Sequence, residues 1–213
     1  MCYSENFICV YELQSDPKVF LCFCLQCNVG FANRMPTNEG LEKYYADYYN
    51  FDKYTDLKDQ HVHFSNPKRL ARHIHRLIRG DMNTNKHSFN IFDFGGGDGT
   101  ISLLLSEILL AHGTKNIIVY LTDYDASIKR STSSAIEFKC AKLTEYPENF
   151  FDLGIASASL EHVPECRQTL IHLLHSLKKG GVLYFRTPHI YPLMKLLRSF
   201  LIEFSFGYPA HLY

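Results

Sequence analysis

Acidic side chains and glycines are interleaved in residues 91–100, which read IFDFGGGDGT. An apolar run comes first, the glycines follow Asp93, and a leucine-rich segment begins directly after Thr100. That order predicts a strand, a glycine turn and a helix, by which an α/β domain offers backbone amides to a nucleotide-like ligand. The residues of this stretch that we expect to bind the ligand are Asp93, Phe94, Gly95, Gly97, Asp98 and Gly99.

The charges in this turn distinguish two kinds of ligand. A dinucleotide site follows the pattern G-x-G-x-x-G, but Thr100 stands at its third glycine. Asp93 and Asp98 would also repel a pyrophosphate, by roughly 1 kcal/mol per close pair even in water. S-adenosylmethionine carries an ammonium, a sulfonium and a neutral ribose, so the same acids would attract it. The sequence therefore favours S-adenosylmethionine, and a nicotinamide-dependent oxidoreductase is the alternative.

Alternating strands and helices must position these residues. Apolar runs predict further strands at residues 117–121, 136–140, 151–156 and 182–187. Apolar residues at helical spacing predict helices at 68–79, after Thr100, and at 170–177. Strands that alternate with helices predict an α/β fold with a Rossmann-like, doubly wound, mostly parallel sheet.

Ligands of such sheets bind beyond the carboxyl ends of the strands. This rule gathers residues 93–99, Asp123 and Asp125, residues 157–162 and residues 187–189 at one edge of the sheet. The further expected cofactor contacts near this edge are Asp123, Tyr124, Ser157 and Leu160. Asp123 ends the second strand and could accept hydrogen bonds from both ribose hydroxyls. His162 and His189 follow two other strands, where a general base would act on an acceptor oxygen or nitrogen. We name both as candidate catalytic residues, and a structural role in a loop is the alternative for each.

The sequence also predicts where two helices end and whether two histidines are exposed. Gly80 should end the helix at 68–79, and the run KKGG at 178–181 should cap the helix at 170–177. His73 and His75 are two residues apart on the first of these helices and do not share a face. We expect both histidines to be exposed.

Five of the seven cysteines lie within the first 27 residues. Cys24 and Cys27 form a C-x-x-C pair between two strand-like runs, a spacing at which both thiolates can bind one tetrahedral metal ion. Cys2 resembles the second half of another such pair, so the candidate zinc ligands are Cys2, Cys24 and Cys27. A small ribbon with buried cysteines and no metal is the alternative. The distribution favours reduced thiols or a metal site over a disulfide framework.

The pattern divides the chain into three units. They are a small Cys-rich, ribbon-like β segment at 1–34, a Tyr-rich helical lid or linker at 35–65, and a Rossmann-like domain at 66–213. The middle unit places four tyrosines within residues 44–49, and these rings either pack internally or touch a substrate.

Composition narrows the possible partners and location. The 22 basic and 22 acidic residues cancel, so no overall field favours nucleic acid or an anionic membrane. No apolar run approaches the roughly 20 residues that span a bilayer, and no signal peptide is evident. We expect a cytoplasmic protein with a small-molecule partner. The apolar residues 191–206 could pack in the core, cover a substrate or contact the second copy in a homodimer.

Four stretches, in this order, resemble the motifs of class I S-adenosylmethionine-dependent methyltransferases. They are IFDFGGGDGT, YLTDYD, FDLGIASASLEHVPE and LKKGGVLYFRTP, and they span about residues 65–190. The resemblance implies methyl transfer from S-adenosylmethionine to an acceptor. CLQCNVGF and RMPTNEGLEKYYADYY resemble a subgroup with an N-terminal zinc-ribbon-like segment. That subgroup is often linked to the modification of sugars or other small molecules.

The chain departs from this family in two places. Ala141, Lys142 and Leu143 stand where the family often has G-D-A beside the adenine, so Lys142 replaces an acid and Leu143 would supply apolar packing. Both are kept as expected cofactor-site positions. The family continues beyond Tyr213 into a helix and two strands, so we expect the last strands to be missing and the chain to be a fragment. A non-catalytic remnant or zinc-dependent interaction module is therefore a further alternative.

Overall fold

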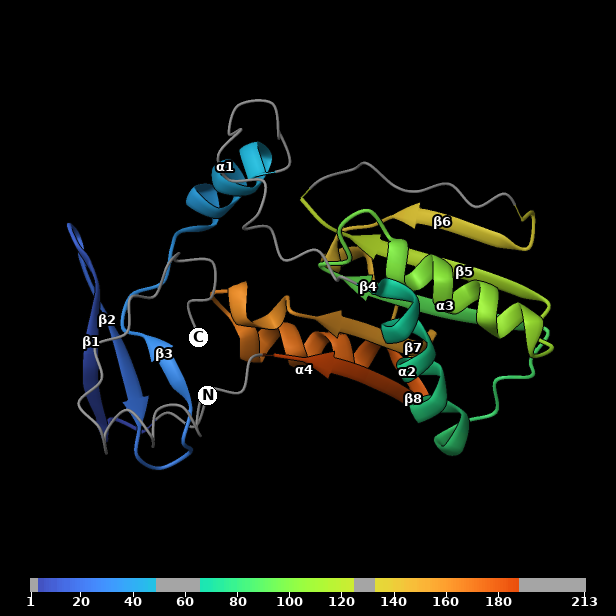
Figure 1. Ribbon diagram of the computed structural model, residues 1–213, viewed down its shortest axis with the longest axis horizontal. Helices are drawn as coiled ribbons and strands as arrows, with labels where there is room; N and C mark the ends of the chain where they lie inside the picture. Colours follow the sequence, from blue (N-terminus) through green and yellow to red (C-terminus); the bar gives the residue numbers. More distant parts are fainter. Residues whose placement is uncertain (1–3, 49–65, 125–132, 188–213) are drawn as a thin grey trace.

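The computed structural model describes residues 4–48, 66–124 and 133–187 (Figure 1). The described chain begins with a small antiparallel sheet of order β1-β2-β3. Its strands are β1 (Phe7–Ser15), β2 (Lys18–Cys24) and β3 (Gly30–Ala32). Helix α1 (Asn38–Tyr48) follows this sheet.

The larger unit is a five-stranded sheet of order β6-β5-β4-β7-β8, in which every described pair of neighbours is parallel. Its strands are β4 (Ser88–Phe94), β5 (Asn116–Thr122), β6 (Ile136–Cys140), β7 (Phe151–Ser157) and β8 (Leu177–Arg186). The helices are α2 (Pro67–Asp81), α3 (Thr100–Ala111) and α4 (Cys166–Ser176), with 3-10 turns η3 (Leu143–Glu145) and η4 (Leu160–His162). The predicted Rossmann-like, doubly wound sheet is confirmed.

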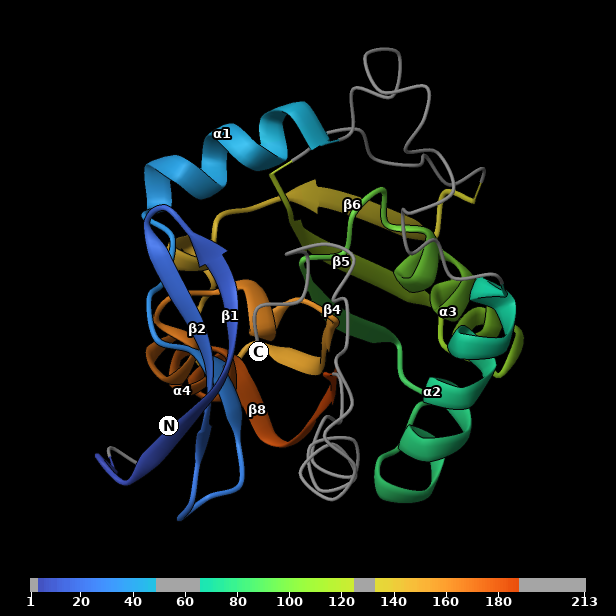
Figure 2. The same ribbon diagram turned by 60° about the vertical axis from the view of Figure 1, so that its left-hand side comes forward.

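The alternation of residues along β4 divides the core into two layers. Phe89 and Ile91 pack with α2 and α3 on one face of the sheet, whereas Phe92 packs with Leu173 of α4 on the other. Figure 2 shows α2 and α3 on one side of the sheet and α4 on the other. Because side chains in a strand point to alternate faces, Asp93 lies on the same face as Ile91, beside α3.

A buried carboxylate joins three strands at the amino end of the sheet. Asp152 is 1% exposed and accepts hydrogen bonds from Lys86 Nζ at 2.7 Å, Lys178 Nζ at 2.8 Å and the backbone N–H of Asn90 at 2.9 Å. Burial raises the pKa of the Asp152 carboxyl, but these hydrogen bonds outweigh it and hold the pKa below its ordinary value. This cluster ties β4, β7 and β8 together at the end of the sheet away from the glycine turn.

The structure corrects three predictions about α2 and α4. Helix α2 continues through Gly80 to Asp81, where the N–H of Met82 bonds to the carbonyl of Ile78. Helix α4 ends at Ser176, and the run 178–181 belongs to β8, because Leu177 already pairs with Phe151 of β7. The sequence pattern missed this pairing because it depends on a distant strand.

His75 is the third correction, since it is buried rather than exposed. It shares the inner face of α2 with Ala71, Ile74 and Ile78, and its ring lies 4.4 Å from that of His112. His73 is exposed, as predicted.

The N-terminal sheet contains a disulfide that the sequence analysis did not predict. Cys9 and Cys22 lie directly opposite each other on β1 and β2 and are joined, so the expectation of reduced thiols was wrong for this pair. Cys24 ends β2 and Cys27 lies in the following turn, as expected; the turn is closed by Asn28 N–H bonding to the Cys24 carbonyl at 3.0 Å. Within the described residues no three potential ligands gather around a metal position, and Cys2 lies outside them.

Candidate functional site

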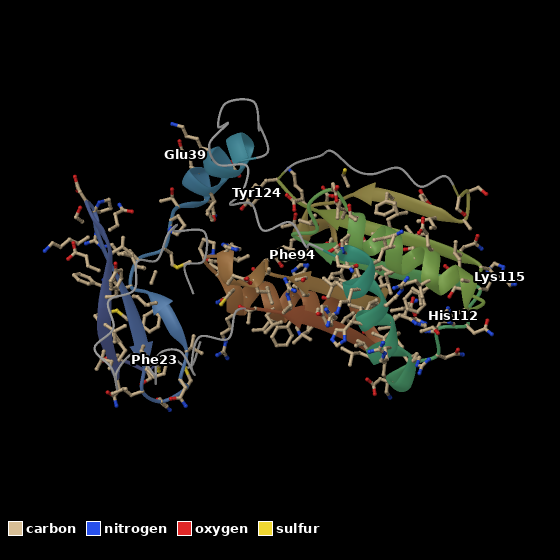
Figure 3. The ribbon with its side chains drawn as sticks, in the orientation of Figure 1. Phe23, Glu39, Phe94, His112, Lys115 and Tyr124 are labelled. Atoms are coloured by element: carbon tan, nitrogen blue, oxygen red, sulfur yellow. A yellow bond between two sulfur atoms is a disulfide. The ribbon has the colours of Figure 1, made fainter. Side chains whose placement is uncertain are left out.

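The residues predicted to bind a cofactor gather at the carboxyl edge of the large sheet. The strand arrows in Figure 1 point toward the side where α1 lies. Figure 3 places Phe94 and Tyr124 at this edge, near α1, and places His112 and Lys115 at the opposite end. The ligand-binding edge expected for a parallel sheet is therefore the edge at which the glycine turn lies.

The glycine turn between β4 and α3 is held by backbone hydrogen bonds. Gly95, Gly97 and Gly99 have positive φ angles of 68°, 58° and 76°, a conformation that side-chain-bearing residues rarely adopt. The N–H of Gly95 donates to the carbonyl of Thr122 at 2.8 Å, so the turn is attached to the end of β5. Gly99 lies immediately before α3.

Asp93 is the central acid of the site. It is 2% exposed, and its Oδ2 atom is buried without a hydrogen-bond partner among the described residues. A Cβ atom on Gly96 would lie only 2.6 Å from this oxygen, so glycine is required there for the turn to pass over the carboxyl group. Burial is the main cause that raises the pKa of Asp93, to about 7; a hydrogen bond with Ser102 lowers it in part, and the charges of Asp123 and Asp98 add smaller increases.

Asp98 and Asp123 shape the turn. Asp98 Oδ1 accepts hydrogen bonds from the N–H of Thr100, at 2.9 Å, and from its hydroxyl group. Asp123 Oδ2 accepts from the N–H of Gly97 at 2.6 Å. A ribose that binds Asp123 would therefore share or replace the bond to Gly97. The three acids look alike in sequence, but Asp93 alone among them has a buried oxygen left without a partner in the described residues.

Tyr146, a buried tyrosine that the sequence pattern did not predict, contacts the last residue of β5. The Tyr146 hydroxyl is 2.8 Å from Thr122 Oγ1, which donates to the Ala141 carbonyl. Burial is the main cause that raises the pKa of Tyr146. Tyr146 also packs against the ring of Phe92. No local pattern marks this residue, because Thr122 and Phe92 come from other segments of the chain.

The two positions predicted beside the adenine differ in burial. Lys142 is exposed, and its backbone N–H donates to Glu145 Oε2 at 3.0 Å. Leu143 is half-buried and packs against the cluster that contains Phe92 and Tyr146. The apolar packing expected of Leu143 is therefore available at this edge, whereas the side chain of Lys142 is directed to solvent.

The loop after β7 supplies the other side of the site. Ala158 has a φ of 58°, and its N–H donates to the Arg186 carbonyl at 2.8 Å. The hydroxyls of Ser157 and Ser159 are buried without a hydrogen-bond partner among the described residues. Leu160 and His162 are half-buried in η4. His189, the second candidate base, lies outside the described residues.

Helix α1 approaches the same edge. Burial raises the pKa of the Tyr124 hydroxyl, and the nearby carboxylate of Glu42 raises it further. Tyr124 is 53% exposed, so its ring is partly accessible at the end of β5. Figure 3 shows Glu39 of α1 and Tyr124 on the same side of the molecule.

One protein family matches most of this domain. A family model described as a methyltransferase domain matches residues 62–201, which is about two thirds of the chain. The match contains the glycine turn and every strand from β4 to β8. The chain belongs to the methyltransferase domain family. The resemblance to class I methyltransferases is thereby confirmed, whereas the zinc-ribbon subgroup stays a prediction.

Three solved structures that are similar to this chain share low sequence identity with it. The cyclase SpnF is 20% identical with a TM-score of 0.46, over 71% of this chain and 60% of that one. An S-adenosylmethionine dependent methyltransferase from Mesorhizobium loti is 20% identical, with a TM-score of 0.39, over 52% of this chain and 51% of that one. A third similar structure is phosphoethanolamine N-methyltransferase 1 from Haemonchus contortus, solved with phosphoethanolamine and S-adenosylhomocysteine. It is 16% identical, with a TM-score of 0.48, over 71% of this chain and 33% of that one.

The chain thus spans less than two thirds of each of these three proteins. No curated protein matched the sequence.

Proposed function

We propose that this protein transfers a methyl group from S-adenosylmethionine to a small-molecule acceptor. The observation that carries the proposal is the unpartnered buried oxygen of Asp93, under a glycine turn in a methyltransferase domain. An ammonium group placed there would satisfy this oxygen and restore the charged form of the carboxyl. A pyrophosphate would add negative charge beside Asp93, Asp98 and Asp123, so a nicotinamide cofactor fits the site poorly.

The residues present fit S-adenosylmethionine at each end of the molecule. Asp93 would hold the ammonium group, and the glycines would allow the ligand to approach the backbone. Asp123 would bind the ribose in exchange for the bond to Gly97, and Leu143 would pack against the adenine. When bound, the cofactor supplies an electrophilic methyl carbon, and the protein's contribution is to align an acceptor with it and exclude water.

The acceptor would enter from the side of α1 and η4. The proximity of Glu42 to Tyr124 supports a role for α1 as one wall of the acceptor site. His162, half-buried at the end of η4, is the described candidate for a base that removes a proton from the acceptor. We propose a sugar or a related metabolite as the acceptor on the basis of the subgroup resemblance.

Calorimetry with S-adenosylhomocysteine tests the proposal. We expect the wild-type protein to bind it with micromolar-range affinity, and we expect Asp93→Ala to weaken binding by about 10- to 100-fold through loss of a charged hydrogen bond. Asp81→Ala, which alters an exposed acid at the end of α2, is the matched control and should bind like the wild type. No binding by the folded wild-type protein would contradict the proposal. Binding of NADH instead would favour the oxidoreductase.

Three further expectations remain predictions. A zinc ion on Cys24 and Cys27 would need two more ligands from outside the described residues, and metal analysis of the purified protein tests it. The cytoplasmic location and the homodimer are likewise to be tested directly. Among the described residues, no helix combines the length and the apolar character needed to cross a membrane.

A further inference from the structure

A second buried polar atom lies beside the glycine turn, in the loop that follows β7, the neighbouring strand of β4. Ser159 is 8% exposed, and its hydroxyl oxygen has no hydrogen-bond partner among the described residues. A buried hydroxyl without a partner costs free energy relative to one in water.

The backbone on either side of Ser159 explains why its side chain lies against the glycine turn. Ala158 adopts a left-handed conformation, which is unfavourable for a residue with a Cβ atom and clusters at functional sites. The N–H of Ala158 bonds to the Arg186 carbonyl of β8, and the carbonyl of Ser159 accepts from the N–H of His162 at 3.1 Å. These bonds fix the loop so that the Ser159 side chain lies against Gly95. A Cβ atom on Gly95 would be 3.3 Å from the Ser159 hydroxyl oxygen.

Ser159 and Asp93 therefore flank consecutive glycines. The Ser159 side chain contacts Gly95 from the β7 side, and the Asp93 carboxyl contacts Gly96 from β4. The two strands are neighbours, with Asp93 paired to Ile155. Two oxygens that lack partners in the described structure thus lie against consecutive glycines of the turn, one a carboxyl oxygen and one a hydroxyl oxygen.

We propose that Ser159 binds the amino-acid end of S-adenosylmethionine, next to Asp93. This inference rests on the proposed function. An amino-acid group carries both an ammonium and a carboxylate, and these require an acceptor and a donor respectively. Asp93 is the acceptor for the ammonium, and the Ser159 hydroxyl donates to the carboxylate.

The test compares two ligands that differ only at this end. S-adenosylhomocysteine carries the amino-acid group, whereas 5′-methylthioadenosine lacks it. Calorimetry is done with the wild-type chain, with Ser159→Ala and with Ser106→Ala. Ser106 is also fully buried, but its hydroxyl bonds to the Ser102 carbonyl inside α3, so Ser106→Ala is a matched control away from the ligand.

We expect Ser159→Ala to weaken S-adenosylhomocysteine binding at least about fivefold and to leave methylthioadenosine binding unchanged. The melting temperature of the ligand-free variant should not fall, because the hydroxyl has no partner to lose in the described structure. The control should bind both ligands like the wild type.

Three outcomes overturn the inference. One is equal binding of S-adenosylhomocysteine by Ser159→Ala and wild type. Another is equal weakening of both ligands, which would place the hydroxyl away from the amino-acid end. If the folded wild type binds neither ligand, the proposed function itself fails and this inference fails with it.

Discussion

At the scale of single residues, the candidate site contains three acids that differ in their hydrogen bonds. Asp98 and Asp123 are engaged by backbone N–H groups of the turn, whereas Asp93 keeps a buried oxygen without a partner in the described residues. Such an arrangement reduces the stability of the ligand-free protein and favours a cationic ligand, a common trade-off at binding sites. The consequences should be visible in both stability and binding.

Asp93→Asn should stabilise the ligand-free protein in a pH-dependent way. The folded pKa of about 7 lies above the unfolded value of 3.8, so the folded wild type loses stability as pH rises between these values. The penalty is absent below pH 3.8 and amounts to at most about 4 kcal/mol above pH 7. We expect the stability gain of the variant to be at least about 1 kcal/mol larger at pH 8 than at pH 5 in urea unfolding. An equal gain at both pH values would show that Asp93 does not titrate in this range.

The same ionisation should control ligand affinity. Because the ammonium of S-adenosylhomocysteine pairs with the charged form of Asp93, binding should strengthen by up to about tenfold from pH 6 to pH 8. Isothermal calorimetry across this range measures the effect, and Asp93→Asn should remove the slope while weakening binding overall. A wild-type affinity that falls with rising pH would contradict this assignment.

At the scale of elements, the glycine turn depends on what lies beneath it. The side chains of Asp93 and Leu121 occupy the space that a Cβ atom on Gly96 would need. The turn between β4 and α3 and the carboxyl group below it are therefore fitted to each other. Gly80 in α2 is different, since no atom lies within 4 Å of the position of its Cβ.

Gly96→Ala and Gly80→Ala should consequently have opposite effects. The first should destabilise the fold by about 1–3 kcal/mol through overpacking and should abolish measurable S-adenosylhomocysteine binding. The second should stabilise the fold by about 0.5–1 kcal/mol, because alanine is the better helix former, and should leave binding unchanged. Chemical denaturation and calorimetry measure both effects. Normal ligand binding by Gly96→Ala would show that the turn adapts readily.

At the scale of the whole molecule, the two ends of the large sheet have different roles. The carboxyl edge carries the strained and unpartnered groups, Asp93, Ala158 and Ser159. The amino end carries the Asp152 cluster, in which each partner is close and β4, β7 and β8 are joined. A buried, fully bonded carboxylate thus lies at the end of the sheet away from the candidate site.

Asp152→Asn should weaken the fold without affecting the site. Loss of a buried charge that accepts three hydrogen bonds should cost about 2–4 kcal/mol at neutral pH. The folded pKa of Asp152 lies below the unfolded value, so this stability is present above the unfolded pKa and is lost as pH falls through the folded one. The difference between variant and wild type should therefore shrink in acid. S-adenosylhomocysteine affinity, measured at a temperature where both proteins are folded, should be equal, and a large change would contradict the separation of roles.

The sequence by itself determined the α/β class, the order of strands and helices, and the position of the glycine turn. These follow from local periodicity and turn chemistry, which depend on neighbouring residues. It also predicted that Asp93 and Asp123 lie together at one edge of the sheet, because the residues that end parallel strands meet there. The tertiary structure alone decided which acid keeps a buried oxygen without a partner in the described residues, because that depends on where Thr100 and the N–H of Gly97 lie.

Other contacts that the sequence did not predict also depend on residues that are far apart in the chain. Ser159 beside Gly95, Tyr146 beside Thr122, and the Asp152 cluster join residues that are far apart in sequence. The disulfide between Cys9 and Cys22 and the burial of His75 against His112 are contacts of this kind as well. Periodicity along the chain predicts which face of an element is buried, but it does not identify the side chain on another element that meets it. In this protein, the chain pattern identified the glycine turn, and only the packing of the strands showed which oxygens are buried without a partner in the described residues.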